Sequence, residues 1–300
     1  SSARQDQGKG SMGTAARTSP CRVSRKRASR REATGRISKA GRSTGRVMTY
    51  NPYPPLIGQT NSRTATQLDA YDAFPYESIA FPETHPNHLA VLGRLLGLET
   101  ATPESARVLE IGCAGGGNLI PLAHSLPHAC CLGIDLSARQ IEMGQDLVRS
   151  LRLANVELRQ ADILDLDASL GQFDYIIAHG VYSWVPDPVR EKLLQLGNRL
   201  LTPAGVFYVS YNCLPGWRMR GMLRDILRYA CREAVSPTER IAAARAALAR
   251  LRDALHGLDA LSARYLQAEI AHLDQVHPSY LLFEYLAEHN RAFLFSDFAT

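Results

Sequence analysis

The feature that most constrains the fold is a short apolar strand that breaks into glycine and then resumes as a helix. Residues 108–111 are apolar apart from Glu110, glycines stand at positions 112, 115, 116 and 117, and helical spacing begins at Asn118. In this arrangement, backbone N–H groups at the start of the helix point toward a bound anion. Glycine-rich turns also serve as plain tight connections, so the choice between the two depends on the segments that follow.

Strands and helices alternate through the middle of the chain. Strand-like runs cover residues 108–111, 129–135, 156–161, 173–179 and 205–212, and helical spacing covers residues 117–126, 137–152 and 187–201. Ser137 is placed to cap the second of these helices, and Asp187 with Pro188 opens the third. Alternation of this kind predicts an α/β fold with a doubly wound parallel sheet.

Glycine or polar residues stand where the first four strands end. They are Gly112, Asp135, Asp162 and His179. Asp135 follows Gly112 by 23 residues, so its carboxylate can bond a ribose diol while the glycine turn holds the other end of the ligand. Because ligands of such sheets bind at the carboxyl ends of the strands, we expect these four residues to converge on one pocket.

The ordered motifs resemble a known family. Val108-Leu-Glu-Ile-Gly-Cys, Gly133-Ile-Asp-Leu-Ser, Ala161-Asp-Ile and Phe173-Asp-Tyr-Ile-Ile are similar to motifs of class I S-adenosylmethionine-dependent methyltransferases, whose fold is Rossmann-like. The middle glycine that is usual in that family's turn is Ala114 here. We expect binding to survive this change, because alanine is the smallest residue that carries a Cβ.

Three further segments resemble one particular group within this family. They are Pro75-Tyr…Thr84-His-Pro, His179-Gly-Val-Tyr-Ser-Trp-Val-Pro186 and Ser210-Tyr-Asn…Leu214-Pro-Gly-Trp217. These segments resemble bacterial methyltransferases with a methyltransferase regulatory domain, a group that includes rickettsial protein-lysine methyltransferases. The resemblance extends from about residue 70 to the end of the sequence.

The first two of four predicted parts precede the sheet. Residues 1–49 form a basic tail, with 13 Lys and Arg against 2 acids, and so few large apolar residues that we predict disorder. The tail fits a non-functional extension ahead of Met48 best, with a nucleic-acid or membrane-surface arm and a targeting peptide as alternatives. Residues 50–104 are predicted to form a coil and a helix, and the resemblance implies that the coil covers the cofactor or substrate pocket. Tyr76 and His85 are the residues of interest in it, with plain packing of the coil onto the domain as the alternative. Thr84 would cap that helix, and Leu89, Leu92, Leu95 and Leu96 would share one face.

Residues 105–217 form the predicted S-adenosylmethionine-binding domain, and residues 218–300 a helical segment. Helical spacing covers residues 218–234, 237–256 and 260–276, and Ser236-Pro237 is a cap-and-start pair. By resemblance this is a regulatory or lid segment, inserted before a helix that begins at Ser296. The family's two closing antiparallel strands would follow, so we expect them to be absent from this chain.

S-adenosylmethionine is the cofactor that the resemblance implies. The backbone of residues 112–116 would hold its amino-acid end with Glu110 shaping the turn, Asp135 its ribose and Asp162 its adenine amino group. Asp162 also fits a plain turn residue. The full cofactor-binding prediction is Glu110, Gly112, Cys113, Ala114, Gly116, Asn118, Asp135, Leu136, Gln140, Asp162, Ile163 and His179. No metal site is predicted.

The loop after the fourth strand is the predicted active site. Tyr182, Trp184 and Tyr211 are candidates for an aromatic wall that attracts a sulfonium or an ammonium group. Asn212 is placed to accept a hydrogen bond from a substrate amine, and His179 to accept a proton. Plain core packing is the alternative for each of these five residues.

The prediction is therefore a methyltransferase that acts on an amine-type acceptor, such as a protein lysine. The alternatives are a non-catalytic S-adenosylmethionine-binding regulator and a nicotinamide-dependent dehydrogenase, whose fingerprint the glycine turn misses by one residue. Outside the tail, the chain has 21 basic and 27 acidic residues, and this excess of acids argues against nucleic-acid binding. There is no Cys-x-x-Cys pair, signal peptide or apolar run of membrane-spanning length, and a cytoplasmic protein fits best. The methyl acceptor and the oligomeric state are left open.

Overall fold

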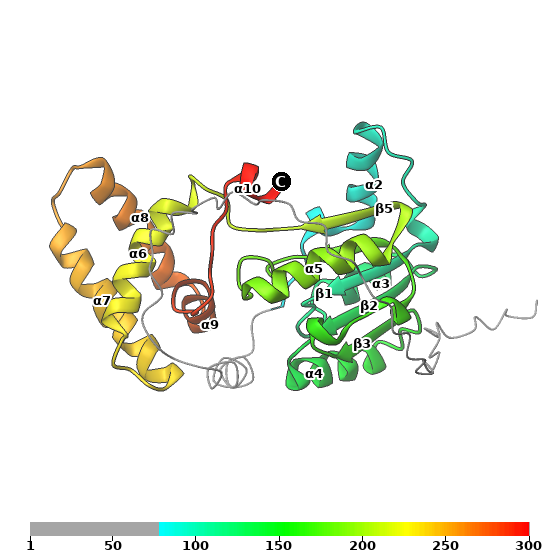
Figure 1. Cartoon of the computed structure of the whole chain (residues 1–300). Coiled ribbons are helices and arrows are strands. Elements are labelled where there is room, and N and C mark those ends of the chain that lie inside the picture. The colour runs from blue at the N-terminus through cyan, green and yellow to red at the C-terminus, as the bar shows by residue number, and fades with distance from the viewer. Residues whose placement is uncertain (1–77, 300) are drawn as a thin grey trace, which may run out of the picture.

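A five-stranded sheet lies at the centre of one lobe of the computed structural model, which describes residues 78–299 (Figure 1). The strands are β1 (Arg107–Ile111), β2 (Cys130–Asp135), β3 (Val156–Gln160), β4 (Phe173–Ala178) and β5 (Leu201–Val209). Their order is β3-β2-β1-β4-β5, and each pair is parallel. The predicted doubly wound parallel sheet is confirmed, and no antiparallel strand occurs within residues 78–299. The basic tail and Tyr76 lie outside the described residues.

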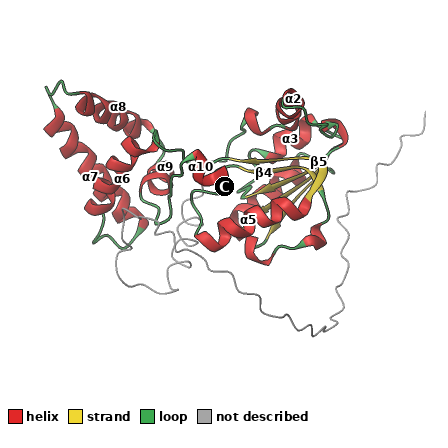
Figure 2. Ribbon diagram, turned by 45° about the horizontal axis from the view of Figure 1, so that its top comes forward, coloured by secondary structure: helices red, strands yellow, loops and turns green. Residues whose placement is uncertain are grey.

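Helices cover both faces of the sheet (Figure 2). One face packs against α2 (Pro86–Leu95), α3 (Leu119–Ser125) and α4 (Ala138–Ser150), and the other against α5 (Asp187–Leu200). Successive residues of a strand point to opposite faces, so Val108 joins the first core and Leu109 the second. Because both faces of β1, β2 and β4 are covered, these strands are mostly apolar, whereas the edge strand β3 alternates buried apolar and more exposed polar residues.

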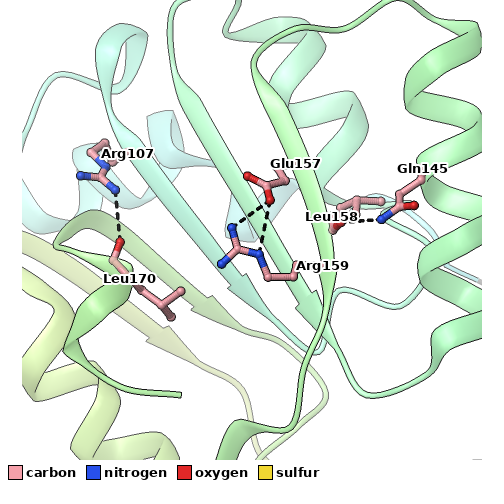
Figure 3. Close-up of polar contacts among 6 residues, drawn as sticks. All are labelled: Arg107, Gln145, Glu157, Leu158, Arg159 and Leu170. Atoms are coloured by element: carbon pink, nitrogen blue, oxygen red, sulfur yellow. Dashed lines mark hydrogen bonds and ion pairs between the residues drawn. The ribbon is translucent and has the colours of Figure 1, made fainter. Parts of the chain in front are cut away.

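Short 3-10 helices and long-range contacts connect these elements. The 3-10 helices are η1 (Pro82–Thr84), η2 (Pro103–Ser105), η3 (Ile163–Asp165) and η4 (Ala168–Leu170). The Arg107 guanidinium donates to Leu170 O over 3.4 Å, and Gln145 Nε2 donates to Leu158 O over 2.9 Å, which ties α4 to β3 (Figure 3). The pair Arg159–Glu157 is largely exposed to solvent and therefore adds little stability.

The prediction for α2 is wrong in its cap and in its buried face. Residues that precede proline favour extended backbone, and the helix begins at Pro86, so His85 rather than Thr84 is the N-cap. Thr84 is instead buried at the end of η1. Leu89 lies in the core, whereas Leu92, Leu95 and Leu96 are exposed, because Ala90 and Gly93 complete the buried face.

The helical segment forms the second lobe in Figure 1, with a hydrophobic core of its own. It contains α6 (Trp217–Ala230), α7 (Pro237–Leu255), α8 (Leu261–Gln275), α9 (Pro278–Tyr280) and the π-helix η5 (Leu281–Tyr285). Ser236 and Glu239 form a complete capping box at the start of α7. No helix of the described chain is long and apolar enough to cross a membrane.

The two ends of the helical segment run side by side. Leu214 N donates to Phe293 O over 2.8 Å, Phe293 N donates to Asn212 O over 2.9 Å, and Cys213 and Phe293 form a parallel bridge. The predicted strand 205–212 thus ends early, at Val209, and its last residues belong to this junction. The returning chain then forms α10 (Phe295–Ala299), where the sequence predicts the next helix.

Charged and aromatic contacts hold the returning chain against α5. Asp187, in the first turn of α5, pairs with Arg190 and with Arg291, which lies 3.3 Å away. The guanidinium carbons of Arg190 and Arg291 lie 5.3 and 4.9 Å from the centre of the Phe293 ring. These contacts, together with the bond from Arg291 N to Ser183 O, place Phe293 beside the loop that follows β4.

Candidate active site

The glycine turn lies at the carboxyl end of β1, between β2 and β4. Gly112 N donates to Ile134 O over 2.8 Å, and Gly116 N donates to Cys113 O over the same distance. Gly112 has a φ of +77°, and a Cβ there would lie 2.5 Å from Val181 Cγ2. Glycine is therefore needed at this position for its conformation and for the approach of the loop after β4.

Ala114 adopts a left-handed conformation, with a φ of +48°. Its N–H donates to Asp135 Oδ2 over 2.8 Å, so the turn keeps the shape that glycine would give it. Left-handed backbone costs an L-residue about 1–2 kcal/mol, and the hydrogen bond to Asp135 helps to offset this cost.

We expect Ala114→Gly to raise the free energy of unfolding by about 0.5 kcal/mol, because relief of the left-handed strain exceeds the entropic cost of glycine. Urea denaturation measures this difference. The matched control is Ala246→Gly on the exposed face of α7, which should lower the free energy of unfolding by about 1 kcal/mol. Destabilisation by both changes would contradict this account of Ala114.

Asp135 ends β2 and bonds the backbone on both sides. Its Oδ2 accepts from Ala114 N, and its Oδ1 accepts from Ser137 N over 2.9 Å. Each carboxylate oxygen can accept more than one hydrogen bond, so both can also accept from a hydroxyl group. Nearby, Leu136 is exposed, and Gln140 is buried in the first turn of α4, where its N–H donates to the Ser137 side chain.

Glu110 is a buried acid beneath the turn. Its Oε1 accepts from Asn118 Nδ2 over 2.7 Å, whereas Oε2 is buried without a hydrogen-bond partner. Burial raises the pKa of Glu110 to about 7, an effect that the bond from Asn118 opposes and nearby Asp135 reinforces. Burial also raises the pKa of the Cys113 thiol, so this residue is an inert neighbour.

Asp162 and Ile163 lie at the end of β3. Asp162 caps η3, since its Oδ1 accepts from Leu164 N over 2.9 Å. Ile163 is partly buried against the second face of the sheet. The sequence left open a plain turn role for Asp162, and this bond fits such a role without using the second carboxylate oxygen.

His179, just after β4, lies among aromatic rings on the α3 side of the sheet. Its ring centre is 4.0 Å from that of Phe81 and 6.0 Å from that of Tyr208, and Nδ1 is 3.5 Å from the Tyr208 hydroxyl oxygen. Burial lowers the pKa of His179, and the charge of Glu83 partly opposes this shift. The imidazole is therefore neutral near pH 7, with a ring nitrogen able to accept a proton.

Tyr182 and Tyr211 gather in a separate aromatic cluster on the opposite side. Their ring centres are 6.1 Å apart, and Phe293 and Phe298 pack against both. Phe298 stacks on Tyr211 with ring centres 4.4 Å apart. The predicted aromatic wall thus brings Tyr182 and Tyr211 together, whereas no ring contact of Trp184 is found in the described chain.

Asn212 is buried at the junction with the helical segment. Its N–H donates to Ser183 Oγ over 2.8 Å, and its Nδ2 donates to Asn290 Oδ1 over 2.7 Å. These bonds use the backbone N–H and one of the two side-chain N–H groups, and they orient the carboxamide. Oδ1 is the group that suits a donor on a substrate.

Several site contacts have no signal in the sequence motifs. Ser78 and Phe81 touch the glycine turn and His179 from the N-terminal side, and Phe293 and Phe298 cover the tyrosine pair from the C-terminal side. The aromatic-proline pair Phe81-Pro82 is the one local hint, because such pairs mark an ordered coil. His85 lines a pocket together with Phe81 and Asn118, and its Nε2 lies 2.9 Å from Ser125 Oγ of α3.

Comparisons with known proteins identify a family and several relatives of this chain. A family model described as a methyltransferase domain matches residues 108–205. Uncharacterized protein RP789 of Rickettsia prowazekii is 40% identical over 250 residues, which cover 83% of this chain and 45% of that protein. Uncharacterized protein RP028 of the same organism is 38% identical over 233 residues, which cover 78% of this chain and 93% of that protein. The structure of PKMT2 from Rickettsia typhi in complex with AdoHcy matches with 40% identity and a TM-score of 0.67, over 75% of this chain and 43% of that one.

The fold, the glycine turn and these relatives define a class I S-adenosylmethionine-dependent methyltransferase, and the chain belongs to that family. Within the family it is related to the rickettsial PKMT-type proteins. The chain spans less than half the length of RP789 and of PKMT2.

The described residues fit S-adenosylmethionine, the cofactor of this family. The N–H groups of Gly112, Cys113, Ala114, Gly116 and Gly117 donate to other atoms of the protein. The fit therefore rests on Glu110, whose unpartnered Oε2 suits the ammonium group of the amino-acid end. Family membership also excludes the nicotinamide-dependent dehydrogenase that the glycine turn had left open. Among the residues of the described range, no cluster of metal-ligating side chains occurs.

Proposed function

We propose that this protein transfers a methyl group from S-adenosylmethionine to the side-chain amine of a protein lysine. The relation to PKMT2 supports the transfer, and the pair Tyr182–Tyr211 is the observation that carries the amine acceptor. Electron-rich ring faces attract cations, and a lysine side chain is a cation with an apolar stem. Asn212 Oδ1, next in sequence to Tyr211, would accept a hydrogen bond from the amine.

Methyl transfer from this cofactor requires few catalytic groups from the protein. When bound, the cofactor supplies a methyl group on a positively charged sulfur. The chain's own residues hold the reactants in line and exclude water. A lysine ammonium must first lose a proton, because its unperturbed pKa is about 10.4. His179 is neutral near pH 7 and is the residue proposed to accept that proton. Because it lies on the other side of the sheet from the tyrosine pair, the proton would reach it through water.

The test is transfer of a labelled methyl group to a lysine-rich acceptor protein. Mass spectrometry should place the label on lysine, and acetylation of the acceptor lysines should abolish transfer. Tyr211→Ala should lower kcat/KM about 5- to 30-fold, since a cation–π contact is worth about 1–2 kcal/mol. Tyr229→Ala, on the exposed face of α6, is the matched control and should leave kcat/KM unchanged.

Three results would contradict the proposal. Label on oxygen atoms or on small molecules alone would identify another acceptor class. Equal loss of kcat/KM in Tyr211→Ala and Tyr229→Ala would remove the proposed role of the tyrosine pair. Cofactor binding without turnover on any acceptor would favour the alternative of a non-catalytic regulator.

A further inference from the structure

Residues 78–84, here called the strap, lie directly on the glycine turn. Ser78 Oγ accepts a hydrogen bond from Gly117 N over 2.8 Å. A Cβ on Gly117 would lie 2.1 Å from the backbone oxygen of Ser78. The strap and the turn are thus in backbone contact, which only glycine at position 117 permits.

One buried side chain joins the strap to the acid beneath the turn. Asn118 Oδ1 accepts from Phe81 N over 2.8 Å, and Asn118 Nδ2 lies 2.9 Å from Thr84 Oγ1. The same Nδ2 donates to Glu110 Oε1 over 2.7 Å. Asn118 is 7% exposed, so these bonds are shielded from water and depend on one another.

The strap also forms part of the surroundings of His179. Phe81 lies against the imidazole with ring centres 4.0 Å apart, and the charge of Glu83 acts on the same ring. Tyr208 closes another side of this ring. The desolvation that keeps His179 neutral therefore depends in part on the strap being in place.

We propose that Asn118 is a positioning residue that couples cofactor binding at Glu110 to closure of the strap over His179. The inference rests on the proposed function, because it takes the ammonium group of the cofactor as the partner of Glu110 Oε2. Phe81 contacts the imidazole of His179 and is therefore the residue through which closure of the strap affects that ring.

The coupling follows from hydrogen-bond chemistry. A cation beside Oε2 favours the ionised form of Glu110, and an ionised carboxylate is the stronger acceptor for Asn118 Nδ2. Donation from Nδ2 polarises the carboxamide, and Oδ1 then accepts more strongly from Phe81 N. Cofactor binding thereby tightens the strap, and a closed strap strengthens cofactor binding by the same factor.

Hydrogen exchange with and without S-adenosylhomocysteine tests the coupling. In the wild-type chain we expect the ligand to slow exchange of the Phe81 and Gly117 amides about tenfold or more. In Asn118→Ala this added protection should be lost, and affinity in calorimetric titration should fall about tenfold, the equivalent of one to two buried hydrogen bonds. Ser78→Ala, a milder change, should speed exchange of the Gly117 amide.

The pKa of His179, followed by NMR titration without ligand, is a second readout. Asn118→Ala should raise this pKa toward the ordinary value, because a loosened strap lets water reach the ring. Asn155→Ala is the matched control, since Asn155 Nδ2 bridges the carbonyls of Ala123, Leu126 and Ala129 away from the site. It should lower the free energy of unfolding without changing strap exchange, affinity or the pKa of His179.

Unchanged protection in Asn118→Ala, or equal effects of Asn118→Ala and Asn155→Ala, would overturn the coupling. Failure of S-adenosylhomocysteine to bind the folded wild-type chain would instead count against the proposed function. In that case the NMR titration of His179 still decides whether Asn118 holds the strap over the ring.

Discussion

Asp135→Ala is expected to lower the affinity for S-adenosylhomocysteine by about 100-fold or more. Hydrogen bonds to a charged group contribute about 1.5–3 kcal/mol each, and the carboxylate is proposed to accept from two ribose hydroxyls. The same change removes the acceptor of Ala114 N, which holds the turn in its left-handed conformation. Loss of the ligand contacts and loss of the turn geometry therefore both lower the affinity. Calorimetric titration of both proteins measures the change.

Asp167→Ala is the matched control for this prediction. Asp167 caps η4 from an exposed position, with Oδ1 2.8 Å from Ser169 N, and is predicted to take no part in cofactor binding. Its replacement should leave the affinity unchanged. Circular dichroism and thermal unfolding show whether each variant is folded. Retention of wild-type affinity by a folded Asp135→Ala protein would remove Asp135 from the cofactor site.

The second large effect is a pH dependence that originates at Glu110. Its pKa of about 7 implies that the proton leaves between pH 6 and pH 8 in the ligand-free protein. If the ammonium group of the ligand requires the ionised form, affinity should rise about 30-fold between pH 5.5 and pH 8.5, in proportion to the ionised fraction. Glu110→Gln should bind weakly and lose this dependence, and Glu142→Gln on the exposed face of α4 should keep it.

Glu110→Gln should also stabilise the ligand-free protein above neutral pH. The folded-state pKa of Glu110 is raised, so its contribution to stability is complete below pH 4.5 and is lost as pH rises through about 7. This loss is about 3 kcal/mol at pH 8.5, and a neutral glutamine avoids much of it. Urea denaturation of both proteins at pH 5 and pH 8.5 measures the difference. Lower stability of Glu110→Gln at pH 8.5 would contradict the assignment of a buried carboxylate whose Oε2 has no hydrogen-bond partner.

The sheet was predictable because its signals are local. Apolar runs such as 173–178 and the acid at the end of β2 can be recognised within a few residues of sequence, and the connection rules then restrict how the strands are placed. The starts of α4 and α7 were predictable for the same reason, because the side chains of Ser137 and Ser236 cap them. The predicted roles of the individual site residues stay predictions that the experiments above test.

Contacts between distant segments were not predictable from the sequence. The leucine row of α2 has helical spacing, but the small residues Ala90 and Gly93 face the sheet, and spacing alone does not show which face is covered. Two ring partners of Tyr182, Phe293 and Phe298, come from more than 100 residues away, because the helical segment returns the chain to the sheet. Motifs report residue types at fixed spacing, whereas such contacts depend on where a long insertion begins and ends.

The paired ends of the helical segment have a consequence for how this family can change. A segment that leaves and rejoins the sheet at neighbouring backbone positions, Cys213 and Phe293, closes its own loop. Its length can therefore vary at a cost in loop-closure entropy that grows only slowly. Helices can be added or lost there while the sheet and the cofactor turn keep their geometry. The helical segment can thus be exchanged while the sheet is kept, and the junction beside Tyr211 and Asn212 is where a different segment would contact the proposed acceptor site.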